Sequence, residues 1–235
     1  MTKDTITLQC SNVDNHYALE HHQLNLSKGV APVITIYHFP NTRGLRAIWA
    51  CEELNIPYKV EIINFLPEFR LSPQFISISP IGKVPVLKDG EVTMRESGAM
   101  VHYLIDKYGN GKLQPSKDDP LYAAYLEWSW FAEATFASSV SEIIRHKRAF
   151  PNAIHTPAIA EFKKRATICL EAVGGVLGKR KWLLGEIFSG TDIMIGIALT
   201  SYIRHVEEPF PPSINDYFER LTTRPAFLRT KQAES

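Results

Sequence analysis

The sequence predicts two domains, the first mixed α/β and the second all-helical. Between residues 33 and 111, short β-branched or alternating runs take turns with helical patterns. Residues 120–235 carry helical periodicity only. A polar stretch with two prolines, residues 112–120, separates the two domains and predicts a linker. Residues 1–32 are polar without a regular period, so we expect a flexible N-terminal extension there.

The first domain begins with a strand, a helix and a second strand. Residues 33–37 form a β-branched run and predict a buried strand. Residues 44–54 predict a helix that ends before Pro57. One face of this helix is apolar, with Leu45, Ile48, Cys51 and Leu54 at helical spacing. Residues 58–62 alternate between apolar and polar side chains and predict the second strand.

A hairpin and a helix complete the first domain. After a proline-containing loop, residues 83–87 and 91–94 predict two strands around the turn Asp89-Gly90. Residues 97–108 predict a helix with an apolar inner face that ends at Gly109. The order of strand, helix, strand, loop, strand, strand and helix describes a thioredoxin-like domain.

The second domain consists of predicted helices over residues 122–146, 157–177, 191–205 and 214–221. The sequence Ser189-Gly190-Thr191-Asp192 precedes an apolar run. A hydroxyl followed three residues later by an acid is typical of a capping box, which starts a helix. We assign this box a structural role and no catalytic one.

Composition excludes several classes of function. Lysine plus arginine less aspartate plus glutamate gives 26 − 25 = +1, so a basic surface for nucleic acid or for a membrane is not expected. No run of 18 apolar residues occurs, which argues against a membrane span. Three widely separated cysteines, Cys10, Cys51 and Cys169, form no metal-binding spacing and fit a reducing, cytoplasmic compartment.

From residue 33 onward the sequence resembles the cytosolic glutathione transferase family. Three segments carry the resemblance: residues 80–87 with 95–99 (PIGKVPVL and RESGA), residues 184–193, and residues 220–227 (RLTTRPAF). The resemblance implies that the thioredoxin-like domain binds glutathione as a co-substrate and that the helical domain supplies the pocket for a hydrophobic electrophile. It also implies a homodimer, and it requires no metal.

The resemblance implies that four residues contact the γ-glutamyl and cysteinyl parts of glutathione. The bond before Pro85 is cis in the family, and the peptide of Val84 then pairs with the cysteinyl unit. The Ser97 hydroxyl donates to the γ-glutamyl carboxylate at a helix N-terminus, and Glu96 faces the γ-glutamyl amine. The alternatives are a proline that ends an ordinary strand and a plain helix cap with an acidic first turn.

Two further parts of the site follow from the same resemblance. Arg70 and Lys83 are candidate partners for the glycine carboxylate of glutathione, although either is also a plausible solvated surface charge. The second pocket is expected to take some of its lining from the aromatic side chains of the helix at 122–146, although aromatics at helical spacing are more often core. They are Trp128, Trp130, Phe131 and Phe136.

The thiol-activating group is expected at the junction of the first strand and helix. Thr42 stands where the family's serine donates to the glutathione sulfur, and Asn41 is the second candidate donor. Arg43 supplies electrostatic help, and Tyr37 is a weaker candidate because it lies within the strand. The alternative is that Thr42 only caps the helix.

The function implied is conjugation of glutathione to an apolar electrophile, or a related ether cleavage, peroxide reduction or disulfide reduction. A redox enzyme using a cysteine is disfavoured, because no cysteine occurs in Asn41-Thr42-Arg43-Gly44. A non-catalytic interaction module on the same fold is the alternative from a different class, since fold does not imply function.

Overall fold

The computed structural model describes residues 33–153 and 155–234. A four-stranded sheet has the order β2-β1-β3-β4, formed by β1 (Ile34–His38), β2 (Tyr58–Ile62), β3 (Val86–Asp89) and β4 (Val92–Met94). β1 is parallel to β2 and antiparallel to β3, which pairs antiparallel with β4. The predicted thioredoxin-like order is therefore confirmed; β2 has the predicted bounds, and the ends of the other strands are shifted by up to three residues.

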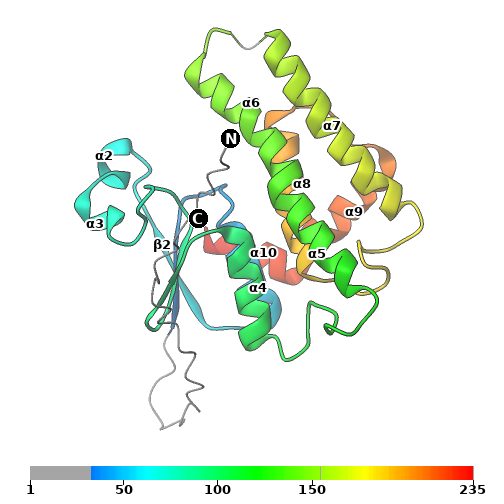
Figure 1. Ribbon diagram of the computed structural model, residues 1–235, viewed down its shortest axis with the longest axis horizontal. Coiled ribbons are helices and arrows are strands. Elements are labelled where there is room, and N and C mark those ends of the chain that lie inside the picture. The colour runs from blue at the N-terminus through cyan, green and yellow to red at the C-terminus, as the bar shows by residue number, and fades with distance from the viewer. Residues whose placement is uncertain (1–32, 154, 235) are drawn as a thin grey trace, which may run out of the picture. The chain divides into compact units, whose positions relative to one another are not determined.

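Two helices pack on the sheet and bring the helical region against it (Figure 1). They are α1 (Leu45–Leu54) and α4 (Ser97–Tyr108), which contact each other and also contact α8 (Gly190–His205). The loop predicted after β2 contains two single-turn helices, α2 (Pro67–Arg70) and α3 (Pro73–Ile76), each opened by a proline at its first position.

The helical region matches the prediction except at two places. Its elements are α5 (Tyr122–Trp130), η1 (Phe131–Ala137), α6 (Ser138–Ala149), α7 (Pro157–Leu177), α8, α9 (Pro212–Thr222) and α10 (Pro225–Ala233). The single helix expected over 122–146 is interrupted by the π-helical segment η1. The unpredicted helix α10 packs on α1.

The core is continuous from the sheet to the helical region. Trp49 of α1 is fully buried, and its ring lies 4.8 Å from that of Phe227 at the start of α10. Gly196 of α8 permits this packing, because a Cβ there would stand 2.8 Å from the Trp49 ring. The helix α8 is buried along most of its length. The α/β and helical regions thus share one core.

The predicted capping box is present at the start of α8. Asp192 is fully buried and accepts hydrogen bonds from the N–H groups of Ser189 and Leu183 and from the hydroxyls of Ser189 and Tyr217. These partners tie α8 to α9 and to the preceding loop. The box is structural, as expected.

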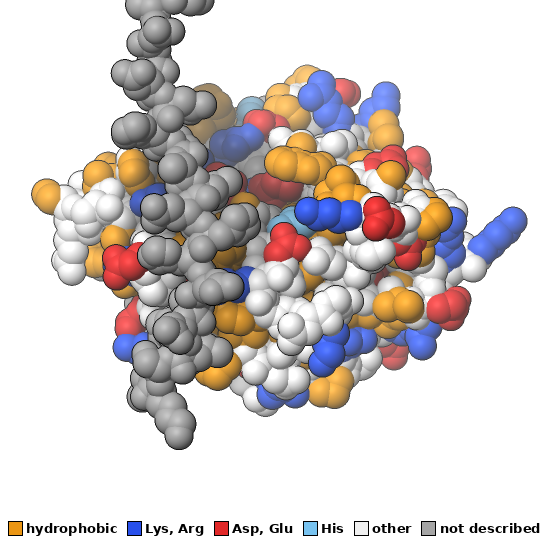
Figure 2. Space-filling model, turned by 60° about the horizontal axis from the view of Figure 1, so that its bottom comes forward, with side chains coloured by type: hydrophobic (Ala, Val, Ile, Leu, Met, Phe, Trp, Pro, Cys, Tyr) orange, Lys and Arg blue, Asp and Glu red, His pale blue; other side chains and the backbone are white. Residues whose placement is uncertain are grey.

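The proposed domain boundary between residues 111 and 120 stays a prediction. The extension predicted over residues 1–32, including Cys10, lies outside the described residues. Among the helices described, none is long and apolar enough to cross a membrane. Acidic and basic side chains are interspersed over the face in Figure 2, in keeping with the small net charge.

Candidate functional site

Two cavities meet where β1 ends and α1 begins. The larger has a volume of about 400 Å³ and lies between this junction and helices α6 and α8. The smaller, of about 70 Å³, lies between the turn before β3 and the start of α4. Arg43, Lys83 and Val84 line both cavities, so the two adjoin.

The eight residues named as leading candidates for binding or activating glutathione each line at least one of these cavities. The larger cavity is lined by Asn41, Thr42, Arg70, Lys83 and Val84. The smaller is lined by Lys83, Val84, Pro85, Glu96 and Ser97. The structure therefore brings together eight residues that span positions 41 to 97 of the chain.

The floor of the smaller cavity is built from two unusual backbone segments. The Val84-Pro85 peptide bond is cis, and Val84 lies two residues before Val86, the first residue of β3 and one that pairs with β1. Glu96, immediately before α4, has a φ of +74°. A non-glycine residue in this region of φ is uncommon and is held there by its surroundings.

A buried arginine holds the Ser97 hydroxyl. Arg46 of α1 is fully buried, and its Nη1 donates to Ser97 Oγ at 3.1 Å. The same guanidinium is paired with Glu133 of η1, which also pairs with Arg43. Because Ser97 Oγ accepts from Arg46, its own proton remains free to be donated to a ligand.

The Thr42 hydroxyl faces both the cavity and the protein interior. Its Oγ1 donates to the carbonyl of Phe39 at 2.8 Å and lies 3.3 Å from His38 Nδ1. The side chain does not cap α1, because the N-cap of that helix is Gly44 and no side chain bonds to its first turn. The alternative that Thr42 is only a helix cap is therefore wrong.

His38 connects Thr42 to the last helix. His38 is fully buried at the end of β1, and its Nε2 lies 3.3 Å from Glu234 Oε2. Burial, reinforced by Lys231, lowers the pKa of His38 to about 4, so the ring is neutral at pH 7. Its single proton belongs on Nε2, where the Glu234 carboxylate accepts it, and the unprotonated Nδ1 lies 3.3 Å from the Thr42 hydroxyl, whose own proton is donated to Phe39.

His38 is expected to make folding stability depend on pH. Its pKa in the folded chain, about 4, lies below the ordinary value of 6.5. Below about pH 6.5 the unfolded chain takes up a proton that the folded chain does not, so stability is complete above this pH and is lost toward pH 4. We expect about 2 kcal/mol of loss between pH 7 and about pH 5 from this residue.

Urea unfolding of the parent and of His38→Gln at the two pH values measures this loss. The parent is expected to lose about 2 kcal/mol more than the variant on acidification, because only the parent carries the imidazole. Equal losses in the two proteins would show that His38 has an ordinary pKa.

Asn41 is held by a network of charged side chains. Its φ is +63°, its N–H donates to Glu234 Oε2 at 2.7 Å, and its Oδ1 accepts from Arg204 Nη2 at 2.6 Å. Glu234 is paired with Lys231 as well. These contacts attach the loop before α1 to the C-terminal ends of α8 and α10.

The two candidate partners of the glycine carboxylate differ in their surroundings. Arg70 donates to the carbonyls of Phe65 and Gly82, at 2.8 and 3.1 Å, and so braces the loop between β2 and β3. Lys83 is exposed and lines both cavities. Lys83 is thus the more available charge, whereas part of the donor capacity of Arg70 is occupied.

The expected aromatic lining of the second pocket is wrong. Trp130 is 68% exposed and Phe136 is fully buried, and none of the four aromatics lines the larger cavity. Instead, η1 contributes Ala137 to the lining, and α6 contributes Val140, Ser141, Ile144 and Arg148.

Sequence reasoning also missed the buried polar groups His38, Arg46 and Glu234 and the half-buried Glu133. The sequence carried one signal, which was the charged residue Arg46 inside the helix predicted over residues 44–54. In the structure every residue from Leu45 to Cys51 is buried, Arg46 included. Charged side chains are seldom fully buried unless they are paired.

The described cysteines do not contribute to either cavity. Cys51 and Cys169 are buried free thiols, and burial raises the pKa of each above its ordinary value. Within residues 33–153 and 155–234 no group of three or more His, Cys, Asp or Glu side chains is arranged to hold a metal ion.

Comparison with known proteins agrees with this architecture. The model of the glutathione S-transferase N-terminal domain matches residues 37–113. Glutathione S-transferase 3 of Schizosaccharomyces pombe is 29% identical over 175 residues, which cover 68% of this chain and 70% of the relative. The disulfide-bond oxidoreductase YfcG of Escherichia coli is 25% identical over 202 residues, covering 83% and 92%.

The fold is shared with solved structures of glutathione transferases. A glutathione transferase family member from Pseudomonas fluorescens, solved with two glutathione molecules bound, superposes with a TM-score of 0.77. The match has 22% identity and covers 85% of this chain and 92% of that one. The domain match and the relatives above support the assignment of the chain to the cytosolic glutathione S-transferase family.

Proposed function

We propose that this protein is a glutathione transferase, which binds glutathione along the two adjoining cavities and activates its thiol beside Thr42. The observation that carries the proposal is the convergence of eight predicted residues on cavities that share Arg43, Lys83 and Val84. The relatives named glutathione S-transferase support the same activity.

The smaller cavity suits the γ-glutamyl end of glutathione. Ser97 begins α4, where the unpaired N–H groups and the helix dipole favour a carboxylate. Its hydroxyl, oriented by Arg46, donates to that carboxylate, while Glu96 accepts from the amine. The peptide of Val84, next in line, is placed to pair with the cysteinyl unit.

The cysteinyl sulfur then lies toward the junction of β1 and α1. An ordinary cysteine thiol has a pKa of about 8.5, so at neutral pH only a few per cent is thiolate. Thr42 turns its proton from the Phe39 carbonyl to the sulfur and so favours the thiolate. The start of α1, with its positive dipole end, acts in the same direction.

Removing the Ser97 hydroxyl tests the binding site. A hydrogen bond to a charged group contributes about 1.5–3 kcal/mol, so Ser97→Ala is expected to raise the glutathione Kd about ten- to a hundred-fold. Calorimetric titration of the parent and the variant measures this directly. Arg46 keeps its pairing with Glu133 in the variant, so the fold is expected to persist.

Ser77→Ala is the matched control, because Ser77 is exposed and lines neither cavity. An unchanged Kd in a folded Ser97→Ala protein would remove Ser97 from the site. Failure of the parent to bind glutathione at all would overturn the proposed function and favour the interaction module. Binding without turnover of any electrophile would favour that module too.

Two properties of the assembly belong to the same proposal. We infer a homodimer in the cytoplasm, as the family resemblance implies. Buried free thiols at Cys51 and Cys169 support a reducing compartment. Light scattering at micromolar concentration is expected to give about twice the chain mass of 26.6 kDa, and a mass equal to one chain would contradict the dimer.

A further inference from the structure

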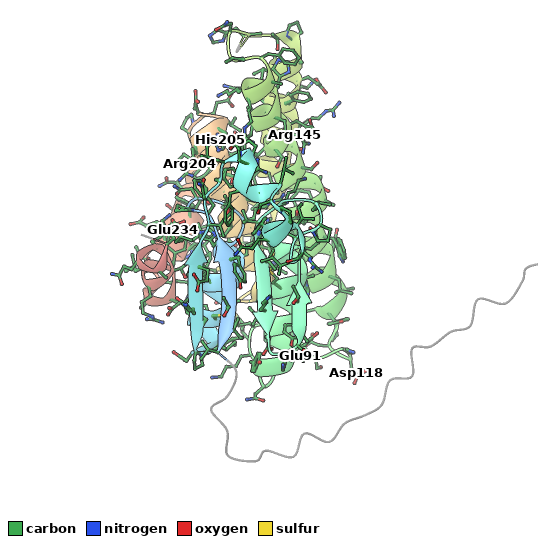
Figure 3. All side chains as sticks on the ribbon, turned by 90° about the vertical axis from the view of Figure 1, so that its left-hand side faces the viewer. Glu91, Asp118, Arg145, Arg204, His205 and Glu234 are labelled. Carbon is green, nitrogen blue, oxygen red and sulfur yellow. The ribbon has the colours of Figure 1, made fainter. Side chains whose placement is uncertain are left out.

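The end of the larger cavity that lies away from the smaller one is apolar on its walls and cationic at its rim. Val140 and Ile144 of α6 and Ile197 of α8 supply apolar wall. Arg148, from the last turn of α6, and Arg204, from the last turn of α8, line the same cavity. Figure 3 shows Arg204 beyond the ends of the strands, at the end of the sheet opposite Glu91.

Neither of these two arginines is paired with a carboxylate of the described residues, whereas the arginines nearer Ser97 are. Arg43 and Arg46 are both paired with Glu133. Arg148 makes no ion pair with any carboxylate of the described residues, and Arg204 donates to the neutral amide of Asn41. No aspartate or glutamate lines the cavity within the described part of the chain.

His205, which lines the cavity beside Arg204, responds to the same positive charge. Burial, Arg204 and Lys147 together lower its pKa, and the opposing effect of Glu207 is smaller. An anion placed there would gain from both arginines, whereas a cation would be repelled.

We propose that the second substrate of this protein carries a carboxylate or a similar anionic group, which Arg148 and Arg204 bind while its apolar body lies against α6 and α8. The proposal rests on the proposed glutathione transferase activity and narrows its substrate class. It replaces a wholly apolar electrophile with an amphiphilic one that is negatively charged at one end.

Two reactions of the glutathione thiolate suit a substrate that carries such an anionic group. In a substitution, the thiolate sulfur forms a C–S bond, the C–Cl bond of an aryl chloride breaks and chloride leaves. In an exchange, the thiolate attacks a disulfide, a new S–S bond forms and the other sulfur leaves as a thiolate. In both, the thiol proton has already passed to solvent, and no further oxidant or reductant is needed.

Matched pairs of substrates test the proposal. The first pair is 1-chloro-2,4-dinitrobenzene and 4-chloro-3,5-dinitrobenzoate, each rate divided by its uncatalysed rate with glutathione. The second pair is a neutral disulfide, bis(2-hydroxyethyl) disulfide, and the anionic 3,3′-dithiodipropionate. For each pair the measured quantity is the ratio of kcat/KM for the anionic member to that for the neutral one.

The parent is expected to favour the anionic member of at least one pair. Arg148→Gln is expected to lower this ratio about fivefold and Arg148→Glu more than tenfold, mainly through KM, because a point charge at the rim acts on binding. Raising the ionic strength should reduce the parent's preference as well. Arg145→Gln is the control, since Arg145 is on the same helix, is paired with Glu142 and does not line the cavity.

Each outcome has a distinct meaning. A preference confined to the aryl chlorides or to the disulfides identifies the source of the anionic group. A parent that turns over both members of a pair equally, with ratios unaffected in the Arg148 variants, overturns the anionic subsite but leaves the transferase intact. A parent that converts no substrate of either pair, although it binds glutathione, counts against the proposed function itself.

Discussion

Replacing Asp192 by alanine is expected to lower the free energy of unfolding by about 3–5 kcal/mol. The fully buried carboxylate accepts four hydrogen bonds, from Ser189, Leu183 and Tyr217. Each buried donor left without a partner costs about 1–3 kcal/mol, and entry of water limits the total. Urea unfolding at neutral pH measures the change.

Two other variants separate the buried cap from a general effect of charge. Asp192→Asn keeps one acceptor but presents an NH₂ group to the donors of Ser189, so an intermediate loss is expected. Asp216→Ala removes an exposed carboxylate on α9 and should change stability by no more than about 0.5 kcal/mol. A loss below about 1 kcal/mol in Asp192→Ala would show that the cap is dispensable.

Replacing Thr42 by alanine is expected to lower kcat/KM at neutral pH about 100-fold. The variant loses the hydroxyl that we place on the thiolate. A rise of about two units in the pKa of the bound thiol corresponds to a loss of about 2.7 kcal/mol in the stabilisation of the thiolate. Much less of the bound glutathione is then thiolate at neutral pH. The loop should keep its place, because Asn41 remains bound to Glu234 and Arg204.

Thr42→Ser is the matched control, since it keeps the hydroxyl and should keep most of the activity. Steady-state kinetics with a chloronitrobenzene, with glutathione varied, separates a change in turnover from a change in binding. Full activity in Thr42→Ala would remove Thr42 from the chemistry and make Asn41→Ala the next variant to measure.

Local patterns predicted most of the fold. The strands at β1 and β2 and the helices α1, α4, α7 and α8 follow directly from periodicity, Gly and Pro positions and the capping box. The helix α10 was missed because only Ala226, Phe227 and Thr230 of its residues are buried, so its apolar pattern is weak.

The pocket lining could not be predicted because of the π-helical segment η1. A π turn inserts one extra residue, which rotates the helix that follows by about 100°. The cavity is therefore lined by Ala137 at the end of η1 and by Val140 and Ile144 of α6, and by none of the four aromatics. An uninterrupted helix, which periodicity predicts, has no such change of face.

The residues around Thr42 fall into those with a sequence signal and those without one. The segment from Lys83 to Ser97 is local in sequence, so the family resemblance could place its residues together. His38 and Glu234, in contrast, are 196 positions apart and meet only because α10 packs on α1. Nothing in the periodicity of either segment indicates that pairing.

The most direct test of thiol activation beside Thr42 is the titration of glutathione bound to the protein. Thiolate absorbance against pH, measured with saturating protein, gives the pKa of the bound thiol. The parent and Thr42→Ser are expected to hold it about two units below the ordinary value of about 8.5, and Thr42→Ala is expected to return it to near that value. Bound glutathione that titrates near 8.5 in all three proteins would contradict thiol activation at this site.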